Sequence, residues 1–233
     1  PGYNNLITST DGDTLESLAT AYVDAVVAGD RHTATLLVQD AVGRGVPVRD
    51  IYLGVFQPAQ HELGRLWQEN QISVAQEHFA TAVTQLNMSQ LYPHIFTSDK
   101  NGRSLVATCV GGELHEIGVR MVADFFEMDG WDTYYMGANT PIGGVLETLE
   151  RVNPDVLAVS TSMTFNLPEI QDLIQRVRDE SSNPDLRILV GGRPFNVDPD
   201  LWQQVGADLY APDAQEAIRV ANEAVGAIQK ERS

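Results

Sequence analysis

The feature that most constrains the fold is a regular alternation of short apolar segments and longer amphipathic segments after residue 103. The short segments are rich in β-branched residues, which is typical of buried strands, and the longer ones carry apolar residues at helical spacing. Because each parallel crossover needs a helix to return the chain, this alternation predicts a parallel sheet with helices on both faces. We expect strands at residues 104–110, 131–136, 156–160, 187–190 and 207–210, and helices at residues 115–127, 141–151, 167–178, 197–204 and 213–229.

The first 97 residues show helical periodicity without strand-like runs. Ser73 followed by Gln76 is a capping box that begins one helix, and Pro58 predicts a kink inside another. Helices of this length with short turns predict an antiparallel four-helix bundle. The predicted fold is therefore α + α/β, with a four-helix bundle cap over residues 1–97 and a five-stranded parallel sheet domain over residues 103–233. The four helices are expected at residues 13–28, 31–42, 48–67 and 73–92.

Charge and composition exclude several classes of function. The 233 residues include 32 acidic and 15 basic side chains, for a net charge of −17, and no basic stripe is present. Direct nucleic-acid binding requires clustered Lys and Arg and is not expected. No apolar run reaches membrane-spanning length and no secretory leader is visible. The single cysteine, Cys109, excludes a disulfide framework, so we expect a cytoplasmic protein without membrane attachment.

The stretch of residues 106–118 joins the first predicted strand to its helix through a glycine-rich loop. Glu113 and His115 lie two positions apart in this loop, so both side chains can point the same way. A carboxylate beside an imidazole fixes the ring tautomer and raises its basicity toward a metal. Gly118 leaves room for a bulky group near the backbone. These residues predict a ligand site, with a helix-capping or surface histidine as the alternative.

Small residues follow two further predicted strands. Hydroxyl groups come after the third strand, at residues 160–162, and Gly191 and Gly192 come after the fourth. Because the carboxyl ends of parallel strands meet at one edge of a sheet, these residues predict a narrow slot for a flat, deeply inserted group. The dinucleotide fingerprint Gly-x-Gly-x-x-Gly is absent, which counts against NAD or FAD. Glycines that only form tight turns are the alternative.

One cluster stands out in the helical region. Trp67 ends the third predicted helix, and Glu77 and His78 lie in the first turn of the fourth. A turn near residues 70–71 can bring the indole and the Glu-His pair to one end of the bundle. A core tryptophan and a solvated Glu-His pair are the alternative.

Together these motifs resemble the cobalamin-binding module, a four-helix cap followed by a flavodoxin-like, Rossmann-type domain. The family pattern of Asp-x-His-x-x-Gly, Ser-x-Leu and Gly-Gly has counterparts in residues 113–118, 160–162 and 191–192. The resemblance implies that His115 is the lower axial ligand to cobalt and that Glu113 orients it. Glu113 replaces the family's Asp, which makes the carboxylate arm one methylene longer.

The resemblance also implies cofactor contacts from residues within or next to the three motifs. Ser160 and the Gly191-Gly192 loop would receive the displaced nucleotide tail of the cofactor. Ser162 replaces the family's Leu, which makes the slot more polar. The remaining implied contacts are Leu114, Glu116, Ile117, Gly118, Thr164 and Arg193.

The pattern of Trp67, Glu77 and His78 looks like the signature of adenosylcobalamin photoreceptors, similar to light-responsive repressors of carotenoid genes. The resemblance implies that Trp67 packs on the upper adenosyl group, that Glu77 hydrogen-bonds it and that His78 lies close by. Light would break the cobalt–carbon bond, and a change in conformation or oligomeric state would signal to a protein partner. In the repressors a cobalt-capping His follows this Trp, but here the residue is Gln68. No winged helix-turn-helix pattern is present.

Some relatives of these repressors, the photocobilins, also hold a linear tetrapyrrole, and the resemblance leaves open a chromophore such as biliverdin. Attachment through Cys109 is not expected, because that thiol should be buried in the first strand. Non-covalent binding near the cap is expected instead, and the candidate residues are His32, His61, His78 and His94.

The expected function is that of a light sensor and not an enzyme, acting as a homo-oligomer. Two alternatives remain. One is a corrinoid carrier of a methyltransferase system, and the other is a flavodoxin-like interaction module without a cofactor.

Overall fold

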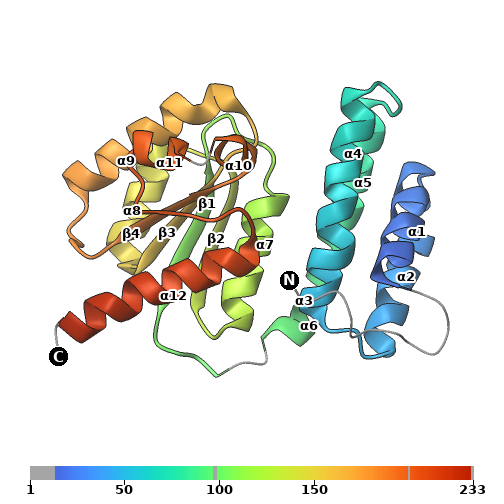
Figure 1. Ribbon diagram of the computed structural model, residues 1–233, viewed down its shortest axis with the longest axis horizontal. Coiled ribbons are helices and arrows are strands. Elements are labelled where there is room, and N and C mark those ends of the chain that lie inside the picture. Colours follow the sequence, from blue (N-terminus) through green and yellow to red (C-terminus); the bar gives the residue numbers. More distant parts are fainter. Residues whose placement is uncertain (1–13, 97–98, 199, 232–233) are drawn as a thin grey trace. The chain divides into compact units, whose positions relative to one another are not determined.

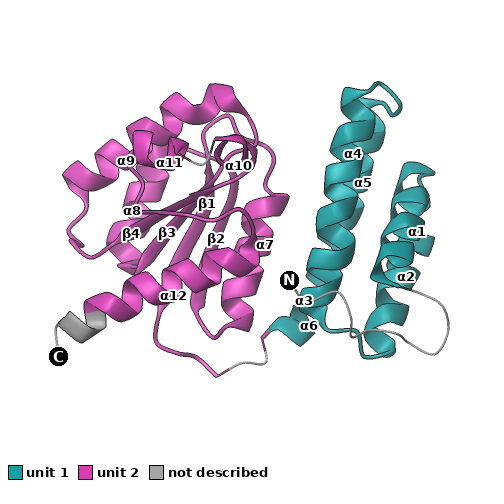
Figure 2. Cartoon of the chain, in the orientation of Figure 1, with its two compact units in different colours: residues 1–95 teal, residues 96–233 magenta. Residues whose placement is uncertain are grey.

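The computed structural model describes residues 14–96, 99–198 and 200–231 (Figure 1). It divides the chain into two compact units, Pro1–Ile95 and Phe96–Ser233, which we call the helical unit and the α/β unit (Figure 2). The expected fold class, a helical cap followed by a five-stranded parallel sheet domain, is confirmed. None of the helices in these residues combines the length and the apolar character needed to span a bilayer.

Most helices of the helical unit begin at a residue whose side chain or ring suits a helix start. Thr14 caps the first helix through the backbone N–H of Ser17, and residue 13, where this helix was expected to begin, lies outside the described residues. The predicted capping box of Ser73 and Gln76 is confirmed, with each side chain accepting from the backbone N–H of the other. The helices are α1 (Leu15–Val27), α2 (Arg31–Gly43), α3 (Val48–Ile51), α4 (Gln57–Gln68), α5 (Val74–Gln90) and α6 (Tyr92–Ile95).

The distortion expected at Pro58 takes the form of a π turn. Residues Tyr52–Phe56 form a π-helix between α3 and α4, and the N–H of Gln57 donates to the carbonyl of Tyr52, five residues earlier. Proline has no N–H and its ring crowds the carbonyl four residues before it in a regular helix. A single wider turn just before Pro58 relieves this crowding without ending the helix.

The core of the helical unit contains a buried aromatic group and a buried polar group. The rings of Tyr22 and Tyr52 lie 5.6 and 5.4 Å from that of Phe56. The Tyr22 hydroxyl is fully buried, lies 3.0 Å from the Thr84 hydroxyl and accepts from Asn87 Nδ2 at 3.2 Å. Burial raises the pKa of Tyr22, although these two hydrogen bonds act in the opposite direction. The aromatic packing holds α1 against the π turn, and the hydrogen bonds hold α1 against α5.

The α/β unit is built on a parallel sheet in the order β2-β1-β3-β4-β5. The order reverses at β1, which pairs with β2 on one side and β3 on the other. Such a reversal opens a crevice at the carboxyl ends of the strands, where ligands of open α/β sheets bind. The strands are β1 (Ser104–Val110), β2 (Asp132–Thr140), β3 (Val156–Ser160), β4 (Arg187–Gly191) and β5 (Leu209–Tyr210).

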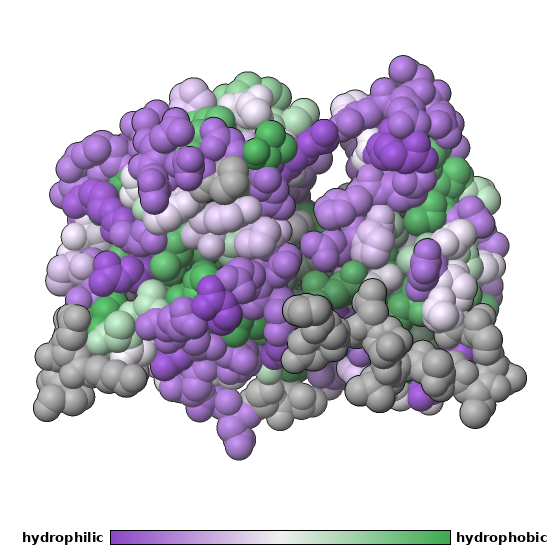
Figure 3. Space-filling view, viewed as in Figure 1, coloured by the Kyte–Doolittle hydropathy of each residue, from purple (hydrophilic) through white to green (hydrophobic). Residues whose placement is uncertain are grey.

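Helices cover both faces of this sheet (Figure 1). Alternate residues of β1, β3 and β4 pack against α8 and α9, because side chains of a strand point to opposite faces in turn. The other face contacts α7 and α12. The view in Figure 3 shows a largely hydrophilic surface, which agrees with the net charge of −17. The helices are α7 (Ile117–Met128), α8 (Ile142–Val152), α9 (Leu167–Glu180), α10 (Arg193–Val197), α11 (Leu201–Gln204) and α12 (Ala214–Glu231).

Three element boundaries differ from the sequence prediction in ways that affect the site. Helix α7 begins at Ile117 instead of residue 115, so His115 lies in the loop. Strand β2 extends to Thr140 and includes the expected loop after it. The single helix expected at residues 197–204 is replaced by α10 and α11. Pro194 is in the first turn of α10, where the missing N–H of proline is not needed, so this helix begins directly after Gly192.

Candidate functional site

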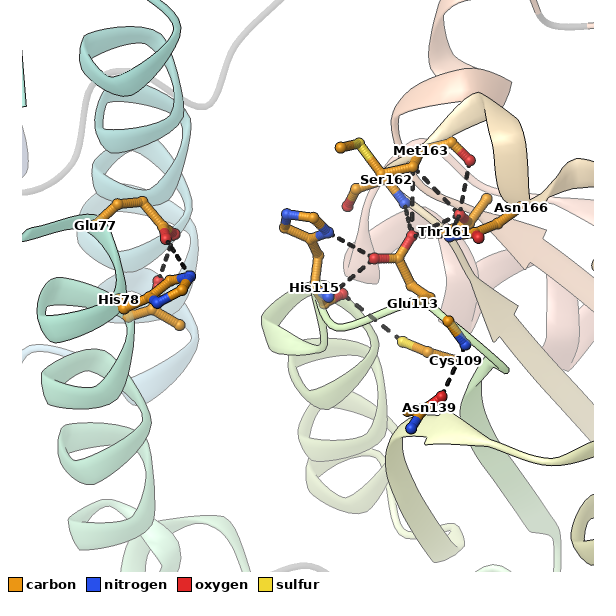
Figure 4. A network of polar contacts seen from close by, with 12 residues as sticks. Glu77, His78, Cys109, Glu113, His115, Asn139, Thr161, Ser162, Met163 and Asn166 are labelled. Carbon is orange, nitrogen blue, oxygen red and sulfur yellow. Dashed lines mark hydrogen bonds and ion pairs between the residues drawn. The ribbon is translucent and has the colours of Figure 1, made fainter. Parts of the chain in front are cut away.

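Glu113 is the centre of the most densely hydrogen-bonded cluster at the carboxyl edge of the sheet (Figure 4). Its side chain is only 1% exposed, in the loop between β1 and α7. One carboxylate oxygen, Oε1, accepts from the backbone N–H of His115 at 2.9 Å and lies 2.6 Å from His115 Nδ1. The other, Oε2, accepts from the Thr161 hydroxyl at 2.6 Å and from Asn166 Nδ2 at 3.0 Å. The backbone N–H of Ser162 donates to the same oxygen at 2.7 Å.

These donors keep the buried carboxylate ionised. Burial alone would raise the pKa of Glu113, because it disfavours the charged form. The hydrogen bonds from His115, Thr161 and Ser162 outweigh burial and hold the pKa well below its usual range. The site therefore presents a fixed negative charge to the imidazole of His115.

His115 is the exposed member of this cluster. Its side chain is 49% exposed, while Nδ1 faces Glu113. A carboxylate on Nδ1 favours the tautomer that carries its proton there, so a metal would be coordinated by Nε2. Glu113 thus holds the His115 imidazole in a fixed orientation at the carboxyl edge of the sheet.

The end of β2 supports the loop that carries the pair. The N–H of Gly112 donates to Asn139 Oδ1 at 2.8 Å, and the N–H of Asn139 donates to the carbonyl of Glu113 at 2.8 Å. The carboxylate of Glu116 accepts from the Tyr135 hydroxyl at 2.8 Å and from the N–H of Ala138 at 2.9 Å. The loop is therefore held from β2 on one side and from the segment after β3 on the other.

Three of the positions expected to line the slot lie close to one another around Ser160. A Cβ atom built on Gly192 would lie 3.2 Å from Ser160 Oγ and only 2.0 Å from the carbonyl oxygen of Thr161. A Cβ built on Gly118 would lie 3.9 Å from the same Ser160 Oγ. One on Gly191 would lie 3.1 Å from the carbonyl of Ala211. The structure thus brings the Gly118, Ser160 and Gly191-Gly192 positions together at the ends of β1, β3 and β4.

The remaining candidates in the α/β unit have mixed surroundings. Leu114 is 71% exposed beside His115, and Ile117 is buried in the first turn of α7. Ser162 contributes its backbone N–H to Glu113. Thr164 begins a short 3₁₀ turn after β3, and Arg193 is exposed at the start of α10.

Two of the three candidates in the helical unit, Trp67 and His78, are exposed, and Glu77 is half-buried. Trp67 is 37% exposed near the end of α4. Glu77 Oε1 accepts from the Thr81 hydroxyl at 2.9 Å, and His78 Nε2 lies 3.6 Å from Glu77 Oε2 (Figure 4). The His78 side chain is 74% exposed, and the other proposed bilin-binding histidines, His32, His61 and His94, are also exposed.

Cys109 is buried in β1, as the sequence analysis expected. Its Sγ donates to the carbonyl of His115 at 3.7 Å. Burial raises the pKa of this thiol, and the negative charges of Glu113 and Glu116 raise it further. The thiol therefore has neither the exposure nor the ionisation needed for covalent attachment of a chromophore.

Sequence reasoning counted Thr161 only among the hydroxyl groups of the expected slot, not as a partner of Glu113, and it missed Asn166. Both are buried and both donate to Glu113, from positions 48 and 53 residues further along the chain. The only available signal was that both follow the third predicted strand, whose carboxyl end was expected to lie at the same edge of the sheet as that of the first. The two backbone donors, the N–H groups of Ser162 and Met163, have no signature in a side-chain pattern.

A single histidine ligand suits a metal ion whose other ligands are supplied by its own cofactor. In the residues covered by the structure, no three His, Cys, Asp or Glu side chains cluster as a metal-binding group. A single carboxylate-backed imidazole instead fits one ligand position of a metal held in a macrocycle. The residues present therefore agree with a corrinoid.

Comparisons with known proteins agree with this class of site. Two sequence profiles described as B12 binding domains match residues 103–219 and residues 18–92. The chain is 27% identical to dimethylamine corrinoid protein 1 of Methanosarcina acetivorans, over 89% of this chain and 97% of the relative. It is 31% identical to dimethylamine corrinoid protein 3 of Methanosarcina mazei, over 58% of this chain and 80% of the relative.

The fold also has a solved counterpart. The structure of the Methanosarcina barkeri monomethylamine corrinoid protein matches with a TM-score of 0.78 and 24% identity, over 90% of this chain and 99% of that one. The fold and the site define a class of proteins that combine a helical cap with a cobalamin-binding α/β domain. The chain belongs to the B12-binding domain family.

Proposed function

We propose that the chain binds a cobalamin with His115 Nε2 as the lower axial ligand to cobalt and serves as the corrinoid carrier protein of a methyltransferase system. The observation that carries this proposal is the imidazole of His115 held on a buried, ionised carboxylate. The carrier function is supported by relatives named as dimethylamine corrinoid proteins, one of which is matched over nearly its whole length. The partner in this proposal is a methyltransferase.

Each residue of the α/β site has a definite task in this proposal. Glu113 orients the His115 ring and keeps its proton on Nδ1. Gly118, Ser160 and Gly192 line the space for the nucleotide tail. When bound, cobalamin supplies the cobalt centre that takes up and gives away a methyl group.

The ligand assignment is tested by His115→Ala with His94→Ala as the matched control. In protein labelled with 15N-histidine, cob(II)alamin bound to the wild type and to the control should show the two-line superhyperfine splitting of a 15N ligand in its EPR spectrum. Bound to His115→Ala, it should show either the three-line splitting of its own 14N base or no nitrogen splitting. Loss of one ligand should also weaken binding about 10- to 100-fold. An unchanged spectrum for His115→Ala would refute His115 as the ligand.

A second function, a light sensor that holds adenosylcobalamin, is favoured by one feature of the helical unit. Trp67 exposes a large apolar ring next to the turn that leads into α5, where Glu77 and His78 stand in the first turn. A methyl group needs no indole and no carboxylate for its recognition. In this alternative Trp67, Glu77 and His78 contact the adenosyl group, and its photolysis changes conformation or oligomeric state for a downstream protein partner.

Loading with each cofactor and illuminating the protein separates the two functions. A carrier should retain methylcobalamin at least as well as adenosylcobalamin and should accept methyl groups from a methyltransferase. A sensor should prefer adenosylcobalamin and should change its absorption spectrum and its oligomeric state after light. Adding biliverdin in the same assay tests the second chromophore, which would bind without a covalent bond.

A further inference from the structure

The pairing between β1 and β2 becomes irregular just before the candidate site. β1 advances three residues from Ala107 to Val110, while the paired residues of β2 advance five, from Tyr135 to Thr140. The two extra residues of β2 therefore interrupt the regular ladder. Such bulges bend a strand and redirect its side chains, and they occur often next to functional sites. The end of β2 thus departs from a regular strand where it meets the loop before α7.

Left-handed backbone accompanies this irregular pairing. Gly137 has φ +81° and Asn139 has φ +52°, and Gly112 in the facing loop has φ +80°. Among residues that carry a Cβ, asparagine is one of the few that adopt this conformation at little cost. Asn153 also has a positive φ, but it ends α8, where a left-handed residue is common. Asn139 instead lies inside a strand, so its conformation has a different cause.

Asn139 makes two hydrogen bonds to the loop on the amino side of His115. Its Oδ1 accepts from the N–H of Gly112, and its own N–H donates to the carbonyl of Glu113, both at 2.8 Å. The left-handed turn lets one residue present a side-chain acceptor and a backbone donor to the same loop. These two bonds fix the backbone path that leads into His115.

A second contact lies directly after His115. Oε2 of Glu116 accepts from the Tyr135 hydroxyl at 2.8 Å and from the N–H of Ala138 at 2.9 Å. Gly137 makes room for it, since a Cβ there would lie only 3.0 Å from the same oxygen. Burial raises the pKa of Tyr135 and the Glu116 carboxylate raises it further, so the hydroxyl keeps its proton and donates.

We infer that Asn139 and Tyr135 are positioning residues that limit the movement of the His115 imidazole as a cobalt ligand. They act through the contacts of Tyr135, Ala138 and Asn139 with residues 112–116, which we call the β2 clamp. Glu113 ties the loop to the segment after β3, and the β2 clamp ties it to the strand on the other side of β1. Without the clamp the loop is held from one side only. This inference rests on the proposed ligand role of His115 and extends it to residues of the neighbouring strand.

Asn139→Gly is the sharpest variant, because it keeps the left-handed backbone and the N–H to Glu113 and removes only the Oδ1 acceptor. Asn139→Asp is the rescue variant, since a carboxylate keeps an acceptor at that place and the exposed position leaves its charge in water. Asn153→Gly is the matched control. It replaces another left-handed asparagine, with φ +50°, at the amino end of β3 and thus at the opposite edge of the sheet.

The first measurement is amide hydrogen exchange in the cofactor-free protein. Asn139→Gly should speed the exchange of the Gly112 and His115 amides about fivefold or more, because the first loses its acceptor and the second lies in the loop that is loosened. Asn139→Asp and Asn153→Gly should leave both rates within about twofold of the wild type.

The second measurement is the dissociation constant of hydroxocobalamin, with and without the His115 imidazole. Asn139→Gly should weaken binding about threefold to tenfold, which is less than the loss expected when the ligand itself is removed. In the His115→Ala background the same change should alter binding by less than about twofold, because the clamp then has no imidazole to position. Asn139→Asp should restore wild-type binding, and Asn153→Gly should not change it.

Tyr135→Phe tests the other half of the clamp, with Tyr134→Phe as its control. It removes one donor to Glu116 and should weaken hydroxocobalamin binding in the same direction as Asn139→Gly, again only while His115 is present. Tyr134→Phe, on the exposed neighbour, should have no effect. This pair carries the test if Asn139→Gly folds poorly.

Equal weakening by Asn139→Gly with and without the His115 imidazole would overturn the positioning role, because the residue would then serve the fold or contact the cofactor itself. Unchanged amide exchange at Gly112 and His115 would overturn the clamp, whatever the cofactor does. If labelled wild type shows no 15N splitting from its histidine, the ligand assignment of the proposed function fails. That result differs from the other two, because the exchange rates still report whether Asn139 holds the loop.

Discussion

The two units of this protein hold their candidate residues in opposite ways. In the α/β unit, Glu113 is 1% exposed and accepts from side chains and backbone groups of two separate segments. In the helical unit, Trp67 is 37% exposed and the His78 side chain is 74% exposed. The first set is part of the packing of the fold, whereas the second contributes little to it. Substitutions of these candidate residues should therefore lower the free energy of unfolding in the α/β unit and change it little in the helical unit.

The largest loss of stability is expected for Gly192→Ala. Gly192 has φ +102°, and a Cβ there would lie 2.0 Å from the Thr161 carbonyl, so the backbone itself must move. We expect the free energy of unfolding to fall by about 3 kcal/mol, measured by urea denaturation. Gly143→Ala in the first turn of α8 is the control, since nothing lies within 4 Å of that position. Similar stabilities for the two variants would show that the backbone after β4 can move away from the added Cβ at little cost in free energy.

Glu113→Gln should be nearly as costly. An amide in place of the carboxylate directs N–H hydrogens at donors from His115, Thr161 or Ser162 and removes the charge that strengthens these hydrogen bonds. We expect a loss of about 2–3 kcal/mol at pH 7. Glu147→Gln on the exposed surface of α8 is the control and should change stability by less than about 0.5 kcal/mol.

The pH dependence of this difference follows from the lowered pKa of Glu113. The contribution of a carboxylate with a depressed folded-state pKa is fully present above its ordinary value of 4.5 and is lost as pH falls through the folded-state value. The stability gap between wild type and Glu113→Gln should therefore persist at pH 5 and shrink only in more acid solution. If the stability difference between wild type and Glu113→Gln disappears above pH 5, the Glu113 carboxylate is not held ionised by its hydrogen bonds.

The same contrast explains what the sequence could predict. The alternation of strands and helices was predictable because buried strands and amphipathic helices leave different periodicities. The pairing of Glu113 with His115 was predictable because it depends on two positions of one loop. The neighbourhood of Ser160 and Gly192 followed from the rule that parallel strands end at one edge.

Other parts depend on tertiary contacts that no local pattern contains. Thr161 and Asn166 became visible as partners of Glu113 only when β1 and β3 were placed side by side. The π turn before Pro58 is one of several ways in which a helix can accommodate proline. The break between α10 and α11 was missed although Pro199, between Asp198 and Asp200, interrupts the apolar pattern of the sequence there.

A smaller effect is expected for a buried polar group of the helical unit. Tyr22→Phe removes a fully buried hydroxyl that contacts Thr84 and accepts from Asn87. We expect a loss of about 1 kcal/mol, since both partners lose a hydrogen bond but part of their bonding remains. Tyr134→Phe, on a residue that is 43% exposed on β2, is the control and should be neutral. A neutral Tyr22→Phe would mean that the polar group in the bundle core is not structurally important.

The smallest change in stability is expected for Trp67→Ala, and this variant tests the contrast most directly. Leu86→Ala is its control, because Leu86 is a similarly exposed apolar residue, 44% exposed on α5. Both should lower the free energy of unfolding by less than about 1 kcal/mol, since neither side chain is fully buried. Only Trp67→Ala should weaken retention of adenosylcobalamin relative to hydroxocobalamin. If Trp67→Ala destabilises the protein by several kcal/mol, the indole serves the fold and the contrast between the units fails. If it changes neither stability nor retention, Trp67 does not contact a ligand.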